Sequence, residues 1–339
     1  MAKLSIFRFI REQYSKQKPV VKTDLTGKVV VVVGANTGLG FEACKHFASM
    51  NPKRLIMGCR NKRKGEEAVS KLQAETRYNR AELWIIDLAS FSSVKSFVEK
   101  LEKECDRLDI LVENAAIADP PKYETTEDGW ASMLQVNAIA PAIQVLLLLP
   151  IMLKTAREHS VTPRIVNVAS DTHYWATLPR DKRVTSGNIL EAMSAENYYD
   201  GSTYKYPETK FLNVLFTRAI QSHLGTHHPP LVVSAVNPGF CYSELRRGMS
   251  GFFYWLMEKV LALTTEEGSR QLVYAALADH EEMPGGYVSF SDVVEPSDGV
   301  IDEAGQRLEE RFWSDLIWVG AKVDDRVPRI VNEYLKAKP

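Results

Sequence analysis

The chain of 339 residues has few cysteines and no excess of charge of either sign. With 42 basic and 43 acidic residues its formal net charge is -1, which gives no electrostatic case for nucleic acid as the main partner. The four cysteines form no CxxC pair and no metal-ligand spacing with the seven histidines, so we expect no metal site. Scattered cysteines also predict reduced thiols in a cytoplasmic protein. They are Cys44, Cys59, Cys105 and Cys241.

Long apolar runs and a secretory leader are also missing. No stretch approaches the roughly 18 apolar residues of a membrane span. The N-terminus lacks both the continuous apolar run and the small-residue cleavage site of a signal peptide. No internal repeat, low-complexity tract or Pro/Ser linker divides the chain. We therefore expect a basic N-terminal segment, residues 1–22, followed by a single domain over residues 23–339.

The N-terminal segment has a composition of its own. Six basic residues stand against Glu12 alone, a net charge of +5, and the segment also carries several large apolar side chains. One interpretation is a short helix that lies on the anionic surface of an intracellular membrane. The other is a helix that packs on the domain or covers the mouth of the substrate site. The sequence leaves both open.

The stretch Lys28–Glu42 organises the rest of the chain. Five consecutive valines, residues 29–33, are too short for a helix and are typical of a parallel strand buried on both faces. Gly34, Gly38 and Gly40 follow, and then an amphipathic helix begins. A buried strand, a glycine turn and a helix N-terminus together form a phosphate site, because backbone N–H groups and the helix dipole face an anion. The alternative is an ordinary strand–helix turn that needs glycine.

Strand and helix patterns alternate through the remainder of the chain. This serial βαβ pattern predicts a Rossmann α/β fold, a doubly wound parallel sheet with helices on both faces. The predicted strands are residues 54–59, 81–86, 108–112, 163–170, 231–236 and 286–290, and the predicted helices include 65–76, 92–104, 130–154, 206–220, 266–279 and most of 303–337.

Candidate polar groups lie at the carboxyl ends of these strands, where open parallel sheets bind ligands. Arg60 follows the second strand, where a site specific for NAD would place an acidic residue. A guanidinium there favours a 2′-phosphate, although a solvated basic loop is the alternative. Asp87 follows the third strand and is a candidate for the adenine amino group or for a helix N-cap.

Tyr206 and Lys210 are the sharpest catalytic signal. On a helix they share one face, and a lysine ammonium beside a phenol lowers the pKa of the phenol from about 10. Tyrosine then serves as a proton donor or acceptor near neutral pH. Ser170, at the end of the fifth strand, is a candidate to hold the substrate oxygen. For Tyr206 and Lys210 the alternative is surface packing, and for Ser170 it is an ordinary loop or cap serine.

These motifs, with Asn114-Ala115, Asn137 and Pro238-Gly239, follow one another in an order that resembles the short-chain dehydrogenase/reductase superfamily over residues 26–295. The chain is most similar to the retinol-dehydrogenase-like branch. The resemblance implies that Tyr206 is the acid/base, that Lys210 binds the nicotinamide ribose and tunes Tyr206, and that Ser170 orients the carbonyl. It implies that Asn137 holds a water in a proton relay. The cofactor contacts that it implies are Gly34, Asn36, Thr37, Gly38, Leu39, Gly40, Arg60, Asp87, Leu88, Asn114, Ala115, Tyr206, Lys210, Pro238, Gly239 and Ser243.

The chain also departs from the family pattern. Glu113 and Ala116 replace an asparagine and a glycine of the Asn-Asn-Ala-Gly motif, and Ala169 replaces the first of two serines. Two apolar segments, residues 171–205 and 240–263, are expected to wall a substrate pocket, because ligand pockets are mostly apolar.

The expected function is an NADP(H)-dependent oxidoreductase that interconverts a lipophilic ketone or aldehyde and its alcohol. The alternative is a nucleotide-binding isomerase, cyclase or non-redox binder on the same fold. The substrate and the oligomeric state, a homo-oligomer included, stay open.

Overall fold

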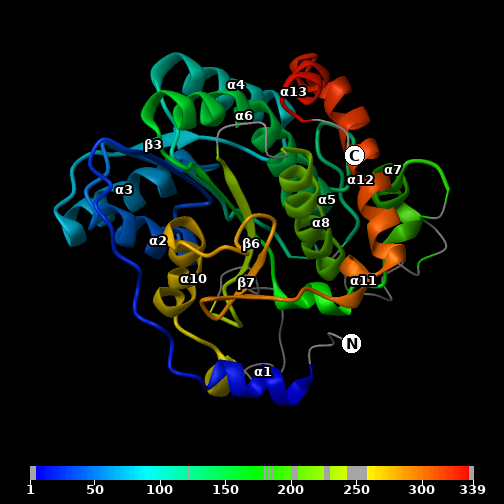
Figure 1. The fold of residues 1–339 in the computed structure, drawn as a ribbon, viewed down its shortest axis with the longest axis horizontal. Coiled ribbons are helices and arrows are strands. Elements are labelled where there is room, and N and C mark those ends of the chain that lie inside the picture. Colours follow the sequence, from blue (N-terminus) through cyan, green and yellow to red (C-terminus); the bar gives the residue numbers. More distant parts are fainter. Residues whose placement is uncertain are drawn as a thin grey trace.

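The computed structural model describes residues 5–118, 120, 122–178, 181, 184, 186–199, 205–224, 230–242 and 258–335. Within them one sheet of eight strands has the order β3-β2-β1-β4-β5-β6-β7-β8 (Figure 1). This order runs outward on both sides of the β1–β4 pair and confirms the doubly wound α/β sheet. The strands are β1 (Val29–Val33), β2 (Arg54–Cys59), β3 (Ala81–Ile85), β4 (Ile110–Glu113), β5 (Arg164–Val168), β6 (Val232–Asn237), β7 (Tyr287–Ser289) and β8 (Asp292–Val294).

The valine run forms the central strand β1. All five side chains are buried, and Val31 pairs in parallel with Ile56 on β2 and with Leu111 on β4. The seven strands from β3 to β7 are parallel, whereas β8 pairs antiparallel to β7. Strand β8 was not predicted. It follows a tight turn at Phe290 and Ser291, both with positive φ, and these are not the glycine and asparagine residues that signal such a turn.

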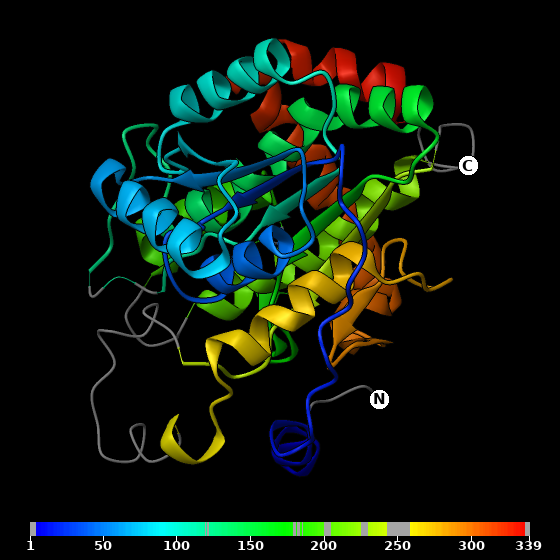
Figure 2. The ribbon, with the colours of Figure 1, turned by 90° about the vertical axis from the view of Figure 1, so that its left-hand side faces the viewer.

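Helices cover both faces of the sheet, as predicted, and each face has its own apolar core (Figure 2). One face carries α2 (Gly38–Ala48), α3 (Lys62–Thr76) and α10 (Thr265–Leu277). The other carries α4 (Phe91–Glu104), α6 (Ala140–His159), α8 (Tyr206–Leu224), α12 (Glu303–Val323) and α13 (Arg326–Tyr334). The shorter helical elements are α1 (Ile6–Gln13), η2 (Asp171–Trp175), α7 (Ile189–Ser194), η5 (Glu196–Tyr198) and α11 (Asp298–Ile301).

The helix predicted over residues 130–154 needs correction. It runs as α5 (Ser132–Leu134), a π-helical turn η1 (Gln135–Ile139) and α6, so that it begins and ends later than expected. By length and composition the helix Ser132–His159 could span a membrane, contrary to the sequence reading, but 94% of its apolar window is buried in the protein. It is therefore the core helix of the domain, and its π-helical turn surrounds Asn137.

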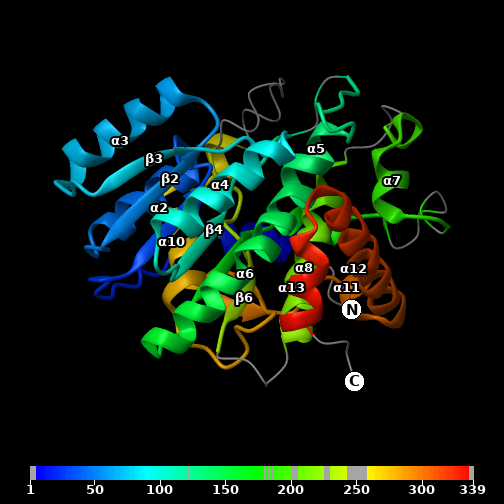
Figure 3. The same ribbon diagram turned by 90° about the horizontal axis from the view of Figure 1, so that it is seen from above.

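The described part of residues 171–205 lies at two places. Helix η2 directly follows β5, and α7 packs beside α12 (Figure 3). The backbone N–H of Ile189 at the start of α7 donates to Asp315 of α12 over 2.7 Å. The substrate-wall role of both apolar segments stays a prediction, and most of residues 240–263 lies outside the described residues.

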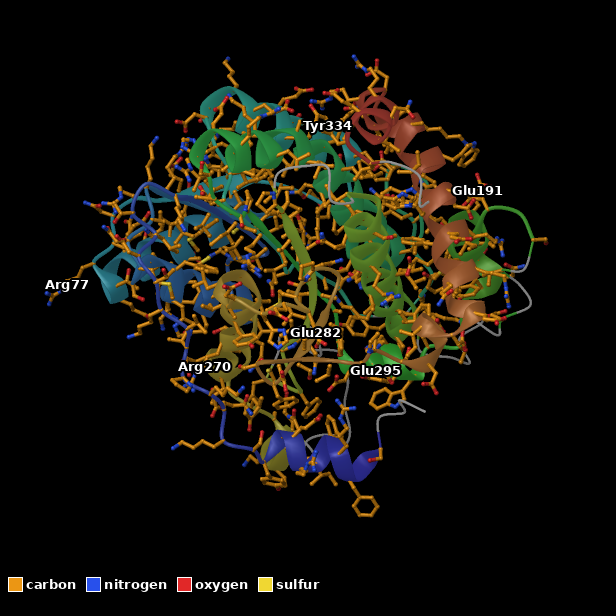
Figure 4. The ribbon with its side chains drawn as sticks, viewed as in Figure 1. Arg77, Glu191, Arg270, Glu282, Glu295 and Tyr334 are labelled. Carbon is orange, nitrogen blue, oxygen red and sulfur yellow. The ribbon has the colours of Figure 1, made fainter. Side chains whose placement is uncertain are left out.

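The N-terminal segment packs on the domain. After α1 the chain crosses α10 and the β7–β8 turn, where the Lys18 ammonium donates to the Ser291 carbonyl over 2.9 Å and Gln271 donates to Gln17 over 3.3 Å. Figure 4 shows Arg270 and Glu295 on the side of the molecule where α1 lies, and Arg270 donates to the Lys18 carbonyl over 3.4 Å. One face of α1 therefore packs on the domain, as in the second of the two interpretations of the N-terminal segment.

Candidate active site

The glycine turn after β1 has the geometry of a phosphate cradle. Gly34 has φ +80°, and a Cβ there would lie 2.7 Å from the Ala115 Cα, so only glycine fits. A Cβ on Gly40 would collide with the Gly34 carbonyl and lie 2.6 Å from the Asn114 amide nitrogen. A Cβ on Gly38 would meet nothing within 4 Å among the described residues. The turn therefore closes on one side against the protein and opens on the other.

The first turn of α2 offers its N–H groups to a ligand. Its N-cap, Thr37, makes no side-chain capping bond within the described residues, and the first turn carries no acidic residue. Asn36 is half-buried beside it. Uncapped N–H groups and the positive end of the helix dipole favour an anion such as a pyrophosphate. The residues present therefore fit the predicted dinucleotide.

Asn114 and Ala115 close the cradle from β4. The Asn114 amide donates to the Gly34 carbonyl over 2.9 Å, which ties the end of β4 to the glycine turn. Asp87 lies after β3, where its carboxylate accepts from the Ala89 N–H over 2.9 Å. The helix N-cap considered for Asp87 is wrong, because Ser90 caps α4. Leu88 is buried beside it.

Arg60 follows β2 and is exposed. Within the described part of the chain it makes no ion pair, whereas its neighbour Arg63 pairs with Glu67 over 2.6 Å. An unpaired guanidinium at this strand end can bind a phosphate group without first breaking a salt bridge.

Tyr206 and Lys210 lie one turn apart at the start of α8, both buried. The Lys210 ammonium is 5.4 Å from the centre of the Tyr206 ring and donates to the Val168 carbonyl at the end of β5 over 2.6 Å. Burial lowers the pKa of Lys210 from 10.5 to about 7. The ammonium therefore exchanges its proton near neutral pH, which suits a proton relay next to a phenol.

Asn137 links this pair to the loop that follows β4. Its carbonyl oxygen accepts from the Ile117 N–H and its amide donates to the Ile117 carbonyl, both over 2.8 Å. The amide also donates to the Thr209 hydroxyl over 3.2 Å, and that hydroxyl donates to the Tyr206 carbonyl over 2.8 Å. The π-helical turn holds Asn137 where both contacts are made, and π turns of this kind are frequent at functional sites.

Ser170 is held through its backbone by residues that sequence reasoning missed. His173 accepts from the Ser297 N–H over 3.1 Å at Nε2, so its Nδ1 carries the hydrogen and donates to the Ser170 carbonyl over 2.8 Å. Burial lowers the pKa of His173 to about 4 and keeps it neutral. Asp171 accepts from the Tyr287 hydroxyl over 2.7 Å. No sequence motif marks His173 or Tyr287.

Asn237 is the other residue that was missed. Its carbonyl oxygen accepts from the Asp171 N–H over 3.2 Å and from the Gly239 N–H over 3.1 Å. It thus fixes the Ser170 strand end and the Pro238-Gly239 turn together. Gly268 lies between Pro238 and the glycine turn. A Cβ on Gly268 would lie 3.0 Å from the Pro238 carbonyl oxygen and 2.8 Å from the Leu39 side chain, so the two turns lie close together. Ser243 lies outside the described residues.

Comparison with known proteins decides the family. A family model described as short chain dehydrogenase matches residues 28–175. The protein named short chain dehydrogenase/reductase dmxR8, from Cryptosporiopsis sp. (strain 8999), is 32% identical over 332 residues, which are 96% of this chain and 99% of that protein. The chain belongs to the short-chain dehydrogenase/reductase family. It is an oxidoreductase of that family, which implies a NAD(P) cofactor.

A second relative agrees with this assignment, and a solved structure shares the fold. The short-chain dehydrogenase anuD from Penicillium roqueforti (strain FM164) is 32% identical over 93% of this chain and 83% of its own length. The structure of salutaridine reductase from Papaver somniferum matches with a TM-score of 0.58 over 77% of this chain and 99% of that one. At 22% identity this structural likeness shows the fold alone.

One departure from the short-chain dehydrogenase/reductase pattern has a clear electrostatic signature. Glu113 stands on β4 between Val33 of β1 and Asn167 of β5, and neither of its buried carboxylate oxygens has a hydrogen-bond partner among the described residues. Burial raises the pKa of Glu113 to about 8. At neutral pH the Glu113 carboxyl is therefore mainly protonated and uncharged. Strand β4 keeps its register with both neighbouring strands around it.

Proposed function

We propose that the protein is an NADPH-dependent carbonyl reductase that converts a lipophilic ketone or aldehyde to an alcohol, or the reverse. The observation that carries this proposal is the buried pair of Tyr206 and Lys210 at the end of β5, joined to Asn137 through Thr209. Such an arrangement delivers a proton at the strand end where the family binds its cofactor.

The chain's own residues then have distinct roles. Tyr206 donates a proton to the substrate oxygen, or removes it from an alcohol. Ser170 holds that oxygen, and the backbone contacts from His173 and Asn237 fix where Ser170 lies. Lys210 restores the proton of Tyr206, because its pKa of about 7 allows exchange near neutral pH. The nicotinamide, when bound, supplies or accepts the hydride.

The test is turnover of NADPH with a panel of carbonyl compounds, followed by the absorbance of the reduced nicotinamide. Tyr206→Phe is expected to lower kcat by at least about 100-fold, the lower end of what general acid–base catalysis contributes. Unchanged turnover in this variant would contradict the proposal. A cofactor that binds but is never consumed would favour the alternative, an isomerase, cyclase or non-redox binder.

We also propose that NADP(H) is the cofactor, on the strength of Arg60. The exposed guanidinium replaces the acidic residue that would bind an unphosphorylated ribose. Dissociation constants for NADPH and NADH are compared before and after Arg60→Ala. The variant is expected to weaken NADPH binding about 10- to 100-fold, as for a lost charged hydrogen bond, and to leave NADH unchanged. An unchanged preference would remove the assignment, and Arg63→Ala, whose side chain is already paired, serves as the control.

The substrate class is proposed from the sequence motifs and the composition of two segments. The retinol-dehydrogenase-like branch stays a prediction from the motifs around Gly38 and Arg60, and a specialised-metabolite ketone is an equal candidate. A retinoid carbonyl and a specialised-metabolite ketone are both lipophilic, in keeping with the apolar composition of residues 171–205 and 240–263.

We further propose that the outer face of α1 contacts an anionic membrane surface. Phe7, Ile10 and Tyr14 form one stripe of the helix, with 82%, 37% and 63% of their surfaces exposed, and the exposed basic residues Arg11 and Lys16 lie next to it. Figure 2 shows α1 projecting from the body of the domain. An aromatic stripe with adjacent positive charge suits the interface of an anionic bilayer.

Sedimentation with vesicles tests this contact. The protein is expected to bind vesicles that contain phosphatidylserine, to bind less in high salt, and to lose binding in the variant Phe7→Ser with Tyr14→Ser. Equal binding by both proteins, or none by the wild type, would contradict the membrane proposal. Self-association that the same variant abolishes would instead assign the stripe to a second copy of the chain.

A further inference from the structure

The side chain of Gln13 connects the N-terminal helix to the turn that follows β6. Gln13 is the last residue of α1 and is 5% exposed. Its amide nitrogen donates to the Phe240 carbonyl over 2.8 Å and to the Leu261 carbonyl over 2.7 Å. Its carbonyl oxygen accepts from the Phe240 N–H over 3.1 Å. One buried side chain thus satisfies both backbone groups of Phe240.

The surroundings of Gln13 are packed against the same turn. A Cβ on Gly239 would lie 3.2 Å from the Gln13 carbonyl oxygen and 3.0 Å from Leu263, so the turn approaches α1 closely. The Phe9 ring meets the Phe240 ring edge to face, with centres 6.3 Å apart. The backbone of Phe240 also pairs with that of Leu263, whose N–H donates to the Phe240 carbonyl over 2.8 Å.

Helix α1 is too short to hold this position by itself. Eight residues form a marginal helix in water, so its place depends on tertiary contacts. Those contacts are the Phe9–Phe240 ring contact, the three hydrogen bonds of Gln13 and, downstream, the bond from the Lys18 ammonium to the Ser291 carbonyl. A polar side chain with all of its hydrogen bonds inside the protein fixes geometry more sharply than apolar packing does.

We propose that Gln13 is a positioning residue for the nicotinamide half of the cofactor, because it fixes the Pro238–Phe240 turn from outside. Asn237 ties this turn to Asp171, next to Ser170, so the turn lies at the catalytic end of the site. Asn237 holds this turn from the sheet side, through the Gly239 N–H, and Gln13 holds it from the opposite side, through Phe240. The inference rests on the proposed cofactor site, and Gln13 itself touches neither substrate nor the reacting atoms.

Comparing the dissociation constants of NADPH and of its adenine half, adenosine 2′,5′-bisphosphate, separates this positioning role from a general loss of structure. Gln13→Met keeps the length of the side chain and removes its three hydrogen bonds. NADPH is expected to bind about 10- to 100-fold more weakly, as for two or three lost hydrogen bonds, while adenosine 2′,5′-bisphosphate binds unchanged. The control is Gln17→Met, a buried glutamine of the same segment that contacts α10, which should change neither constant.

An equal loss for NADPH and the half-cofactor, no loss for either, or the same effect in Gln17→Met would overturn the proposal. Hydrogen exchange of the cofactor-free protein tests the contact separately. The Phe240 amide should exchange faster in Gln13→Met than in the wild type, and an unchanged rate would contradict the positioning role. A wild type that binds neither NADPH nor the half-cofactor would refute the proposed cofactor and this inference with it, while the exchange result would still report the contact. If Gln13→Met does not fold, Gln13→Glu, which removes only the two donated bonds, takes its place.

Discussion

At the glycine turn the site is defined by backbone atoms, whereas at the catalytic end it is defined by buried side chains from distant segments. Between Gly34 and Gly40 the limits are a positive φ and the clearance of missing Cβ atoms. Around Ser170 the backbone is held by His173 and Asn237, and the turn beyond Asn237 is held by Gln13.

This difference explains how each end responds to change. A backbone site fails when a side chain is added, because the atoms that it would meet cannot move. A side-chain network fails when a partner is removed, because a buried N–H or carbonyl is then left unsatisfied. The two ends can therefore be tested by opposite kinds of substitution.

The largest effect is expected from Gly40→Ala at the backbone end. The new methyl group would collide with the Gly34 carbonyl and the Asn114 amide, and overpacking of this kind costs about 3 kcal/mol. We expect lower stability in denaturant titrations and loss of dinucleotide binding, seen by fluorescence titration. The control is Gly27→Ala, where no atom of the described residues lies within 4 Å of the new methyl group and only the left-handed φ is strained. Equal binding by Gly40→Ala and the wild type would contradict a tight cradle.

The sequence predicted the backbone end better than the side-chain end. The valine run, the three glycines and the spacing of Tyr206 and Lys210 are local signals, and each lies where it was expected. Asn237, His173 and Gln13 depend on partners far along the chain: 124 residues separate His173 from Ser297 and 227 separate Gln13 from Phe240. No local pattern encodes such pairs. The π-helical turn at Asn137 was also invisible, because its apolar pattern is that of an ordinary buried helix.

A smaller effect is expected from Asn237→Ala at the side-chain end. The change leaves the buried N–H group of Asp171 and the partly buried N–H group of Gly239 without their acceptor, so Ser170 and the Pro238-Gly239 turn lose a common support. We expect kcat/KM to fall by about 10- to 100-fold, with most of the loss in kcat. Asn167→Ala is the matched control, because within the described part of the chain the Asn167 side chain donates only to the Asn213 carbonyl, so its loss should affect stability alone. Equal kinetic losses in both variants would make the role of Asn237 purely structural.

The smallest effect on turnover, and a distinct effect on stability, is expected from Glu113→Gln, which lies between the two ends on β4. The folded pKa of Glu113 is raised from 4.5 to about 8, so between these values the folded protein binds the extra proton. The free energy of unfolding therefore falls as pH rises from about 4.5 to about 8, by up to a few kcal/mol. Glutamine cannot ionise and removes this contribution.

Denaturant titrations of the wild type and Glu113→Gln, near pH 5 and near pH 8, measure this contribution to the free energy of unfolding. The difference between the two proteins at each pH separates Glu113 from other buried groups such as His173. The two proteins should be about equally stable at the lower pH, and Glu113→Gln should be the more stable at the higher pH. A difference that does not depend on pH would mean that the Glu113 carboxylate is solvated or paired in solution. An unchanged kcat in Glu113→Gln would show that Glu113, on the strand between the two ends of the site, takes no part in catalysis.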